Sequence, residues 1–236
     1  MGLCFALATF GAQNNFHLEH HQDSFGMRSH GVIEVVNGSS KFYPLPQSTW
    51  EDYVRLRPKD VAMNPLAATN NSYEREEVIG PYQIEGGKVW FGKSFYDGEG
   101  ERGVGAFGYF DTETRRYRLF SPPEVAPYEV SAMLVEADSV WLGLDHQGED
   151  ISAFPGGLMR WDRSTEKVRL YPIEFVVTAM ERRGDVLRLS TNGGYAELRG
   201  EVVERFSVRK TANGKTETMR IDKFPPPPSH HWQPPR

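Results

Sequence analysis

The chain has 236 residues, of which 39% are hydrophobic and 12% aromatic, with 23 Gly and 16 Pro. This composition is typical of a globular domain with many turns and excludes a disordered chain. The formal charge of −5 comes without a basic stripe, which argues against a nucleic-acid partner, and no apolar run approaches the roughly 18–20 residues of a membrane helix.

The chain begins with MGLCFALATFGAQ, which is apolar and rich in small side chains, as in a secretory signal peptide. It lacks a basic residue ahead of the apolar part, however, and the apolar run is short. We therefore predict a buried strand at residues 3–7, in which Cys4 is expected to be inert. A single cysteine forms no intrachain disulfide, so the compartment stays open: cytoplasmic by default, or extracytoplasmic if the N-terminus is truncated.

Two β-rich runs follow at residues 31–36 and 41–43, separated by Asn37-Gly38. Asn-Gly between such runs is the strongest short-range signal for a hairpin. Ahead of them lies F-H-L-E-H-H-Q-D, which contains His20 and His21 and which we predict to be a loop. With the strand at residues 3–7, these runs make a first structural unit over about residues 3–44.

Residues 45–77 interrupt the strand pattern. Ser48-Thr-Trp-Glu51 is a capping-box sequence, in which the Ser48 hydroxyl bonds the amide three residues on and Glu51 reaches back. It predicts a short helix to about Arg57, ended by Pro58. We expect this insertion to cover one face of the domain or an open edge of its sheets.

Two copies of one unit come next, displaced by 51 residues. Val-Trp-Phe-Gly at residues 89–92 matches Val-Trp-Leu-Gly at 140–143, and further matches keep the same offset and order. They pair Gly105, Phe110, Asp111, Thr114, Arg116, Arg118, Leu119 and Phe120 with Gly156, Trp161, Asp162, Thr165, Lys167, Arg169, Leu170 and Tyr171. Since one offset carries every match, we infer an internal repeat.

Each copy contains four short strands. The Val-Trp run is β-rich and ends at Gly, and a further apolar run precedes it, at residues 82–84 or 130–135. A hairpin follows, with a polar turn that begins at Asp111 or Asp162. A weaker copy occupies residues 174–207. Four strands repeated every ~40–50 residues are typical of a propeller blade.

The sequence therefore predicts an all-β fold, a β-propeller of about four four-stranded blades within a single domain over residues 1–224. The blades are expected at residues 3–44, 78–121, 129–172 and 174–207.

The first unit lacks an opening strand. Residues 217–222, in which Met219 and Ile221 alternate with polar residues, are predicted to supply it by pairing with residues 3–7, which would close the ring. The alternative is a fragment of a larger propeller. A closed ring would be a monomer, whereas a fragment would self-associate through its unpaired edges. Residues 225–236 form a Pro-rich tail, expected to be disordered or to dock as extended polyproline on an aromatic groove.

Three of the four units carry a long polar loop at the same position, after the Val-Trp strand or its equivalent. Equivalent loops of a propeller lie on one face, so they predict an acidic, His-bearing rim around the mouth of the ring, a default place for a ligand. The alternative is a set of long solvated turns. The candidate binding residues are His20, His21, Asp97, Glu99, Glu101, Asp145, His146, Glu149 and Asp150.

The repeated residues themselves are expected to be structural, because repetition argues for a structural cause. We predict that Trp90 and Trp141 are core residues and that Asp111 and Asp162 form turns. The sequence contains no G-x-S-x-G, P-loop or H-E-x-x-H motif. No cofactor is predicted, although converging imidazoles and carboxylates would suit a divalent metal such as Zn²⁺.

The motif Val-Trp-x-Gly, followed by [Phe/Trp]-Asp-x-x-Thr and a basic-aromatic strand, resembles the propeller repeats in the sensor regions of two-component regulators. It is also similar to the propeller of virginiamycin B lyase and its relatives. The resemblance covers about residues 78–206 well and 3–44 weakly, and it implies blades. The sensor family implies binding without chemistry, and the lyase family implies a metal-assisted elimination by His and acidic residues.

Two functional hypotheses result. The first is a non-catalytic binding or sensing propeller, with a small-molecule or protein ligand at the loop-rimmed face and with neither nucleic acid nor a membrane as partner. The second is a propeller lyase or hydrolase that uses His146, nearby carboxylates and a divalent metal.

Overall fold

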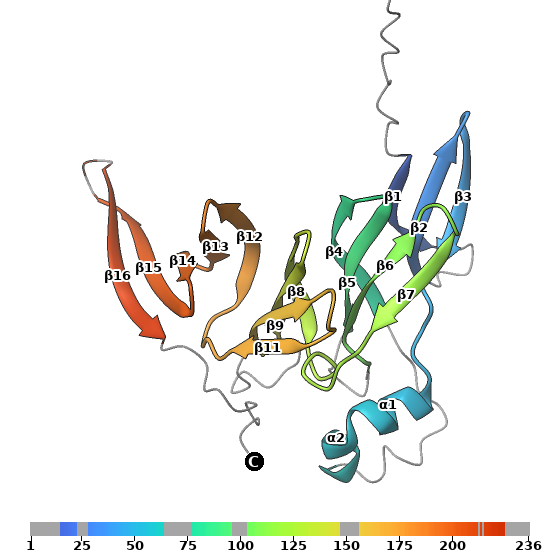
Figure 1. Ribbon diagram of the computed structural model, residues 1–236, viewed down its shortest axis with the longest axis horizontal. Coiled ribbons are helices and arrows are strands. Elements are labelled where there is room, and N and C mark those ends of the chain that lie inside the picture. Colours follow the sequence, from blue (N-terminus) through green and yellow to red (C-terminus); the bar gives the residue numbers. More distant parts are fainter. Residues whose placement is uncertain are drawn as a thin grey trace, which may run out of the picture.

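The computed structural model describes residues 15–22, 28–63, 77–95, 103–146, 156–211, 213 and 215–224 (Figure 1). Four antiparallel sheets hold the strands of this part of the chain, and its helices are the short α1 (Trp50–Leu56) and α2 (Pro58–Met63). The prediction of an all-β fold is confirmed. Among the described residues no helix has the length and apolar character needed to span a bilayer.

Each sheet is a meander in which strands consecutive in sequence pair antiparallel. The first sheet contains β1 (Phe16–Gln22), β2 (Arg28–Val36) and β3 (Ser39–Pro44). The second contains β4 (Glu77–Glu85), β5 (Lys88–Phe95), β6 (Ala106–Asp111) and β7 (Arg116–Phe120). The third contains β8 (Glu129–Val135), β9 (Ser139–Asp145), β10 (Gly157–Asp162) and β11 (Val168–Tyr171). The fourth contains β12 (Val177–Arg183), β13 (Val186–Thr191), β14 (Gly194–Arg199), β15 (Val202–Lys210) and β16 (Thr216–Phe224). Figure 1 shows the sheets in chain order, with the first and the fourth at opposite ends of the row.

The predicted hairpin at Asn37-Gly38 joins β2 to β3. Both residues adopt positive φ, 51° and 79°, which a two-residue turn of this kind requires because its backbone must match the twist of the strands. Asn tolerates this conformation and Gly adopts it freely, so the local sequence determines the turn.

The second and third sheets coincide with the two clear copies of the repeat. The Val-Trp strands are β5 and β9, and each is followed by the predicted hairpin, β6–β7 or β10–β11. Trp90 and Trp141 are 2% and 5% exposed, so the prediction that both are core residues is confirmed.

The glycine of each Val-Trp-x-Gly motif is explained by packing between sheets. A Cβ on Gly92 would lie 2.5 Å from Val130 of β8, the first strand of the next sheet. A Cβ on Gly143 would lie 3.0 Å from Val177 of β12, again the first strand of the next sheet. A larger residue would force the sheets apart. The repeated Gly therefore marks the place where the second and the third sheet each meet the sheet that follows.

Apolar clusters fill the spaces between neighbouring sheets. The cluster between the second and third sheets includes Trp90, Phe107, Leu142, Met159 and Trp161, all nearly or fully buried. The cluster between the third and fourth includes Trp141, Leu158, Tyr171, Leu187 and Leu189. Full burial of one such aliphatic or Phe side chain contributes about 1.5–3 kcal/mol, so these layers stabilise the packing of neighbouring sheets.

The first sheet differs from its prediction. Its first strand is β1, which contains His20 and His21, so the expectation that these residues lie in a loop is wrong. β1 pairs with β2 along its whole length, with His20 opposite His30, and Phe16 and Leu18 pack on the cluster around Val32. Alternating apolar residues in a histidine-rich run therefore favour a strand. The strand predicted at residues 3–7 lies outside the described residues.

The C-terminal strand predicted at residues 217–222 exists as β16. It pairs with β15 and extends the fourth sheet to five strands. Its predicted partner at residues 3–7 lies outside the described part of the chain, as does the Pro-rich tail at residues 225–236, so ring closure stays a prediction.

The helix of the insertion begins one residue later than predicted. Thr49, not Ser48, is the N-cap: its Oγ1 accepts from Asp52 N at 3.1 Å, and Asp52 Oδ2 accepts from Thr49 N at 2.9 Å. Ser48 is displaced from capping because its Oγ accepts a hydrogen bond from Lys93 Nζ at 2.6 Å. A long-range contact thus selects between two adjacent capping sequences.

Candidate functional site

The long connections of the chain gather at one end of the sheets. In each antiparallel meander, the loop between the Val-Trp strand and the hairpin lies at the same end as the linker to the next sheet. We call this end the loop face. By strand order it carries the β1–β2, β5–β6 and β9–β10 connections and the two helices. α1 and α2 lie at the bottom of Figure 1. Tight turns occupy the opposite end, which we call the turn face.

Most of the predicted binding residues lie outside the described residues. These are Asp97, Glu99 and Glu101 in the β5–β6 loop and Glu149 and Asp150 in the β9–β10 loop. The backbones of His20 and His21 lie near the loop-face end of β1. Asp145 ends β9 and His146 follows it, so these two are the candidates whose side-chain surroundings the structure describes.

Asp145 lies opposite Glu129, the first residue of β8, and we call these two residues the acidic pair. Burial, and then the charge of Asp145, raises the pKa of Glu129 to about 7. Burial likewise raises the pKa of Asp145, while a hydrogen bond from the His146 amide at 2.8 Å opposes that shift. Glu129 can therefore hold or release a proton near neutral pH. The sequence analysis identified Asp145 but not Glu129. The two residues are neighbours only because of the register between β8 and β9, which the sequence does not reveal.

His146 adds a further polar group beside the acidic pair. Its Nδ1 is enclosed and has no hydrogen-bond partner among the described residues. Within those same ranges, no group of three or more His, Cys, Asp or Glu side chains converges as metal ligands would. The acidic pair and His146 can thus exchange hydrogen bonds or a proton with a bound molecule.

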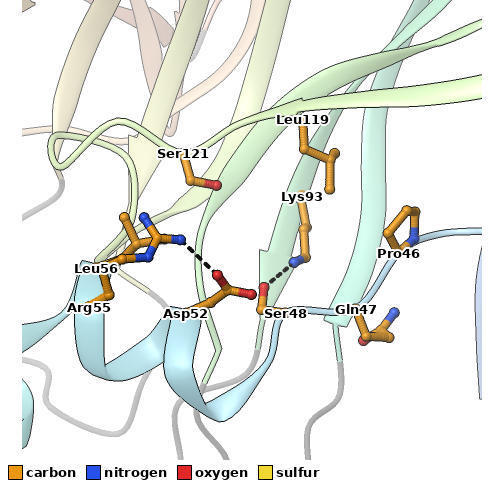
Figure 2. A pocket seen from close by; sticks show the side chains of 9 residues that line it. All are labelled: Pro46, Gln47, Ser48, Asp52, Arg55, Leu56, Lys93, Leu119 and Ser121. Carbon is orange, nitrogen blue, oxygen red and sulfur yellow. Dashed lines mark hydrogen bonds and ion pairs between the residues drawn. The ribbon is translucent and has the colours of Figure 1, made fainter.

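A pocket of about 430 Å³ lies between α1 and the loop-face ends of β5 and β7 (Figure 2). We call it the α1 pocket. Its size falls in the range of small-molecule sites. Its lining residues come from three separate segments: Pro46, Gln47, Ser48, Asp52, Arg55 and Leu56 from the insertion, Lys93 from β5, and Leu119 and Ser121 at the end of β7.

Lys93 is the most unusual residue of the α1 pocket, because its side chain is charged and the residue is only 1% exposed. Figure 2 shows its ammonium directed toward Ser48, with Asp52 and Arg55 beyond. Asp52 and Arg55 form an ion pair at 2.7 Å. The hydrogen bonds from the Thr49 amide and from Arg55 hold the pKa of Asp52 below its ordinary value, so this carboxylate stays ionised.

The wall of the α1 pocket is fixed in place by contacts under the helix. Tyr53 is buried against Val104 and Ala126, which belong to the loop-face connections of the second sheet. Arg57, 5% exposed, donates from Nη1 to the Gly103 carbonyl at 3.1 Å. The helix is therefore anchored to the sheet, and the pocket is largely formed before a ligand arrives.

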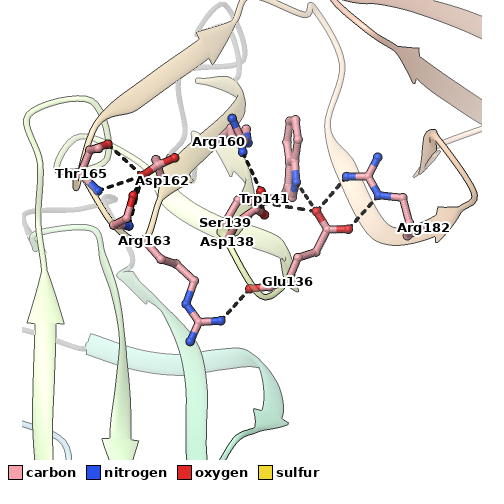
Figure 3. A network of polar contacts seen from close by, with 10 residues as sticks. Glu136, Asp138, Ser139, Trp141, Arg160, Asp162, Arg163, Thr165 and Arg182 are labelled. Atoms are coloured by element: carbon pink, nitrogen blue, oxygen red, sulfur yellow. Dashed lines mark hydrogen bonds and ion pairs between the residues drawn. The ribbon is translucent and has the colours of Figure 1, made fainter.

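The turn face carries a polar network between the third and fourth sheets (Figure 3). The Glu136 carboxylate accepts from Trp141 Nε1 at 2.8 Å and from Arg182 Nε and Nη2 at 2.7 and 2.8 Å. Arg163 Nη1 donates to the Glu136 carbonyl at 2.6 Å. Because the charges of this network are paired with one another, we interpret it as structural.

The predicted roles of Asp111 and Asp162 as turn formers are confirmed. Asp111 Oδ1 accepts from the amides of Glu113 and Thr114 at 3.0 and 2.8 Å. Asp162 Oδ1 accepts from the amides of Ser164 and Thr165 at 3.1 and 2.8 Å (Figure 3). Equivalent residues thus make equivalent turns in two sheets.

Comparison with known proteins yields no matching family model and no matching curated protein. Among solved structures, the chain is similar to the extracellular domain of a hybrid two-component system from B. thetaiotaomicron, at 9% identity and a TM-score of 0.42, over 84% of this chain and 28% of that one. A second structure, the extracellular domain of a one-component system from B. thetaiotaomicron, matches at 9% identity and a TM-score of 0.41, over 86% and 29%. The chain thus spans less than a third of the length of either neighbour, and a likeness at this level assigns no residue role here.

Proposed function

We propose that the chain is a non-catalytic binding or sensing domain whose sheets are blades of a β-propeller and whose ligand occupies the loop face. Two features support the blades: the sheets share one strand order, and the second and third sheets each meet the following sheet at the repeated Gly of the Val-Trp strand. The sequence resemblance to sensor-region propeller repeats agrees with this function.

The observation that carries the proposal is the α1 pocket. It combines a volume suited to a small molecule with a buried charge and several hydrogen-bonding side chains, and it lies where the long loops of neighbouring sheets emerge. The turn face, by contrast, is occupied by ion pairs between its own residues. The loop face is therefore the better place for a small-molecule or protein partner.

A second candidate function is a lyase or hydrolase that uses a divalent metal. The acidic pair favours it, since the pKa of Glu129 near 7 is suited to general acid–base catalysis and His146 lies beside Asp145. Elemental analysis of the purified protein separates the two functions. A stoichiometric metal that is lost on His146→Ala would replace the binding function by the enzymatic one.

Ligand-observed NMR with a mixture of amino acids, sugars, nucleotides and organic acids tests the binding function. We expect at least one compound class to bind. Its binding should be lost in Ser121→Trp, which fills the α1 pocket, and retained in Glu201→Trp, which places the same side chain at the turn face. Binding that survives Ser121→Trp, or the absence of binding by any class, would refute the proposal.

A further inference from the structure

β16 forms the outer edge of the fourth sheet, at one end of the row of sheets (Figure 1). It pairs with β15 on one side, and no strand of the described ranges lies along its other side. The last strands of the second and third sheets, β7 and β11, have five and four residues, whereas β16 has nine. Short edge strands limit pairing with other chains. The longer β16 therefore offers unpaired backbone N–H and C=O groups to a further extended segment.

The first part of β16 is regular enough to pair with such a segment. Thr216 to Arg220 pair residue by residue with Lys210 to Phe206, and a bulge interrupts the ladder only after Arg220. The turn of this hairpin is closed by a hydrogen bond from Thr211 N to the Lys215 carbonyl at 2.8 Å. Because a bulge bends an edge strand, the straight edge available to a partner is the stretch from Thr216 to Arg220.

Apolar side chains of the β15–β16 hairpin are exposed. Met219 is 58% exposed and Ile221 is 47% exposed, and Val208 on β15 is 39% exposed. These are three of the seven large apolar side chains that the described part of the chain exposes, and Met219 is the most exposed of them. Isolated exposed apolar residues are common, but a group of them on one element marks an interaction surface. Covering these side chains with a partner is favourable.

The same hairpin is basic in an acidic chain. Residues 205–220 contain five basic residues and one acidic residue, Glu217, so their formal charge is +4, whereas that of the whole chain is −5. Arg209 and Lys215 are exposed, and neither forms an ion pair with another described residue. Glu217 lies opposite Arg209 in the ladder and offsets part of the positive charge. The net charge of the hairpin attracts an acidic partner and repels a second copy of itself.

We propose that the edge of β16 is a docking site for a protein partner, through an extended segment that is net acidic and carries apolar side chains. The segment adds to the fourth sheet along Thr216 to Arg220, as in other cases of strand addition. Its apolar side chains cover Met219, and its carboxylates lie near Arg209 and Lys215. The α1 pocket is lined by the insertion and the second sheet, so this docking site is separate from it and goes beyond the proposed function.

The charge of the hairpin distinguishes this partner from two other occupants. Residues 3–7, which we predict to pair with residues 217–222, contain no acidic side chain and so leave the basic residues of the hairpin without a complement. A second copy that docked edge to edge would bring the same positive charge to the interface. An acidic, extended partner segment satisfies both the backbone edge and the charge.

The experiment is a fluorescence anisotropy titration of the full chain with short labelled peptides. The acidic probe alternates Glu with Val, the basic probe alternates Lys with Val, and a third probe is the acidic one with its central Val replaced by Pro. We expect the acidic probe to bind about 10-fold or more tightly than the basic probe at low salt, and the Pro-containing probe to bind about 10-fold more weakly, because Pro lacks the N–H of the ladder.

NMR locates the bound peptide. The acidic probe should shift the amide signals of residues 216–220. Equal affinity for the acidic and basic probes, no loss with the Pro-containing probe, shifts confined to other strands, or no binding of the acidic probe would each overturn the inference.

Variants of exposed side chains test the role of charge without disturbing the fold. Arg209→Gln together with Lys215→Gln should weaken binding of the acidic probe about 10-fold. The matched control, Arg183→Gln together with Arg199→Gln, removes the same charge from β12 and β14 of the same sheet and should leave the affinity unchanged. Glu217→Gln removes the one acidic side chain and should strengthen binding. Equal effects of the two arginine-containing pairs, or weaker binding in Glu217→Gln, would contradict the proposal.

The two other occupants give different results. If residues 3–7 occupied the edge, Phe5→Pro would free it and raise the affinity for the acidic probe, whereas we expect no change. If a second copy occupied it, light scattering would show a dimer that Met219→Lys converts to a monomer, whereas we expect a monomer throughout. Either result would refute the acidic partner. The small-molecule test of the α1 pocket is unaffected by these outcomes, because none of these variants alters its lining.

Discussion

Removal of the Glu136 carboxylate tests whether the turn-face network holds the third and fourth sheets together. Glu136 follows β8, Trp141 lies on β9, and Arg182 lies on β12, so one carboxylate joins two sheets. The hydrogen bonds from Arg182 hold the pKa of Glu136 below its ordinary value of 4.5, so the network is charged at neutral pH.

The magnitude follows from what Glu136→Ala leaves behind. The indole N–H of Trp141, a residue only 5% exposed, loses its acceptor, which costs about 1–3 kcal/mol. The ion pair with Arg182 is partly exposed, at 32% and 23% for the two side chains, and contributes about 0–1 kcal/mol. We expect a loss of about 2 kcal/mol in the free energy of unfolding, or about 4–8 °C in Tm for a chain of this size.

Urea unfolding at pH 7 measures the effect. The matched control is Glu181→Ala, whose ion pair with Arg183 is half exposed and whose loss should change stability by less than about 0.5 kcal/mol. Because the pKa of Glu136 is lowered by folding, its contribution is present above pH 4.5 and is lost as the pH falls through the folded-state value. Equal effects of Glu136→Ala and Glu181→Ala, or a difference independent of pH, would refute the reasoning.

Three further predictions concern the turns and the loop face. Asp162→Asn should lower Tm at pH 7, because hydrogen bonds from Ser164 and Thr165 hold the pKa of the Asp162 carboxylate well below 3.8. In thermal scans, the Tm difference from wild type should shrink as the pH falls below 3.8. A Tm difference that stays constant with pH would contradict the role of Asp162 in the turn. Gly105→Ala should lower the free energy of unfolding in urea by about 1–3 kcal/mol, since the added Cβ would lie 1.8 Å from the Tyr128 carbonyl oxygen. An unchanged urea midpoint would contradict this packing. Burial raises the pKa of Glu129 from 4.5 to about 7, so ionisation of Glu129 lowers the free energy of unfolding as the pH rises between those values. Glu129→Gln should therefore be more stable than wild type at pH 8 but not at pH 4. The opposite pattern would show that Glu129 is not a buried acid.

The fold was largely predictable where the signal is local. Strand alternation, the Asn37-Gly38 turn and the Asp-initiated turns act over a few residues, and the 51-residue repeat predicts the strands β5 to β7 and β9 to β11. Prediction failed where distant residues intervene. His20 and His21 belong to a strand because β1 finds a partner in β2, and α1 begins after Thr49 because Lys93 engages Ser48.

The candidate site was predictable only in part. Repetition placed the long loops at one end of the sheets, and Asp145 with His146 marks that end in the third sheet. Glu129 and Lys93 were not identified, since neither stands in a recognisable motif. One signal was available for Lys93: aligning the copies puts a lysine opposite Leu144, a core position.

Local sequence specifies the repeating unit, its strands and turns, and the burial of Trp90 and Trp141, because hydrophobic period and turn chemistry are properties of neighbouring residues. Long-range packing brings α1, β5 and the end of β7 around one pocket, and the register of β8 and β9 places Glu129 opposite Asp145. Those juxtapositions join residues far apart in the chain. They depend on sheet order and strand register, which packing between the sheets determines.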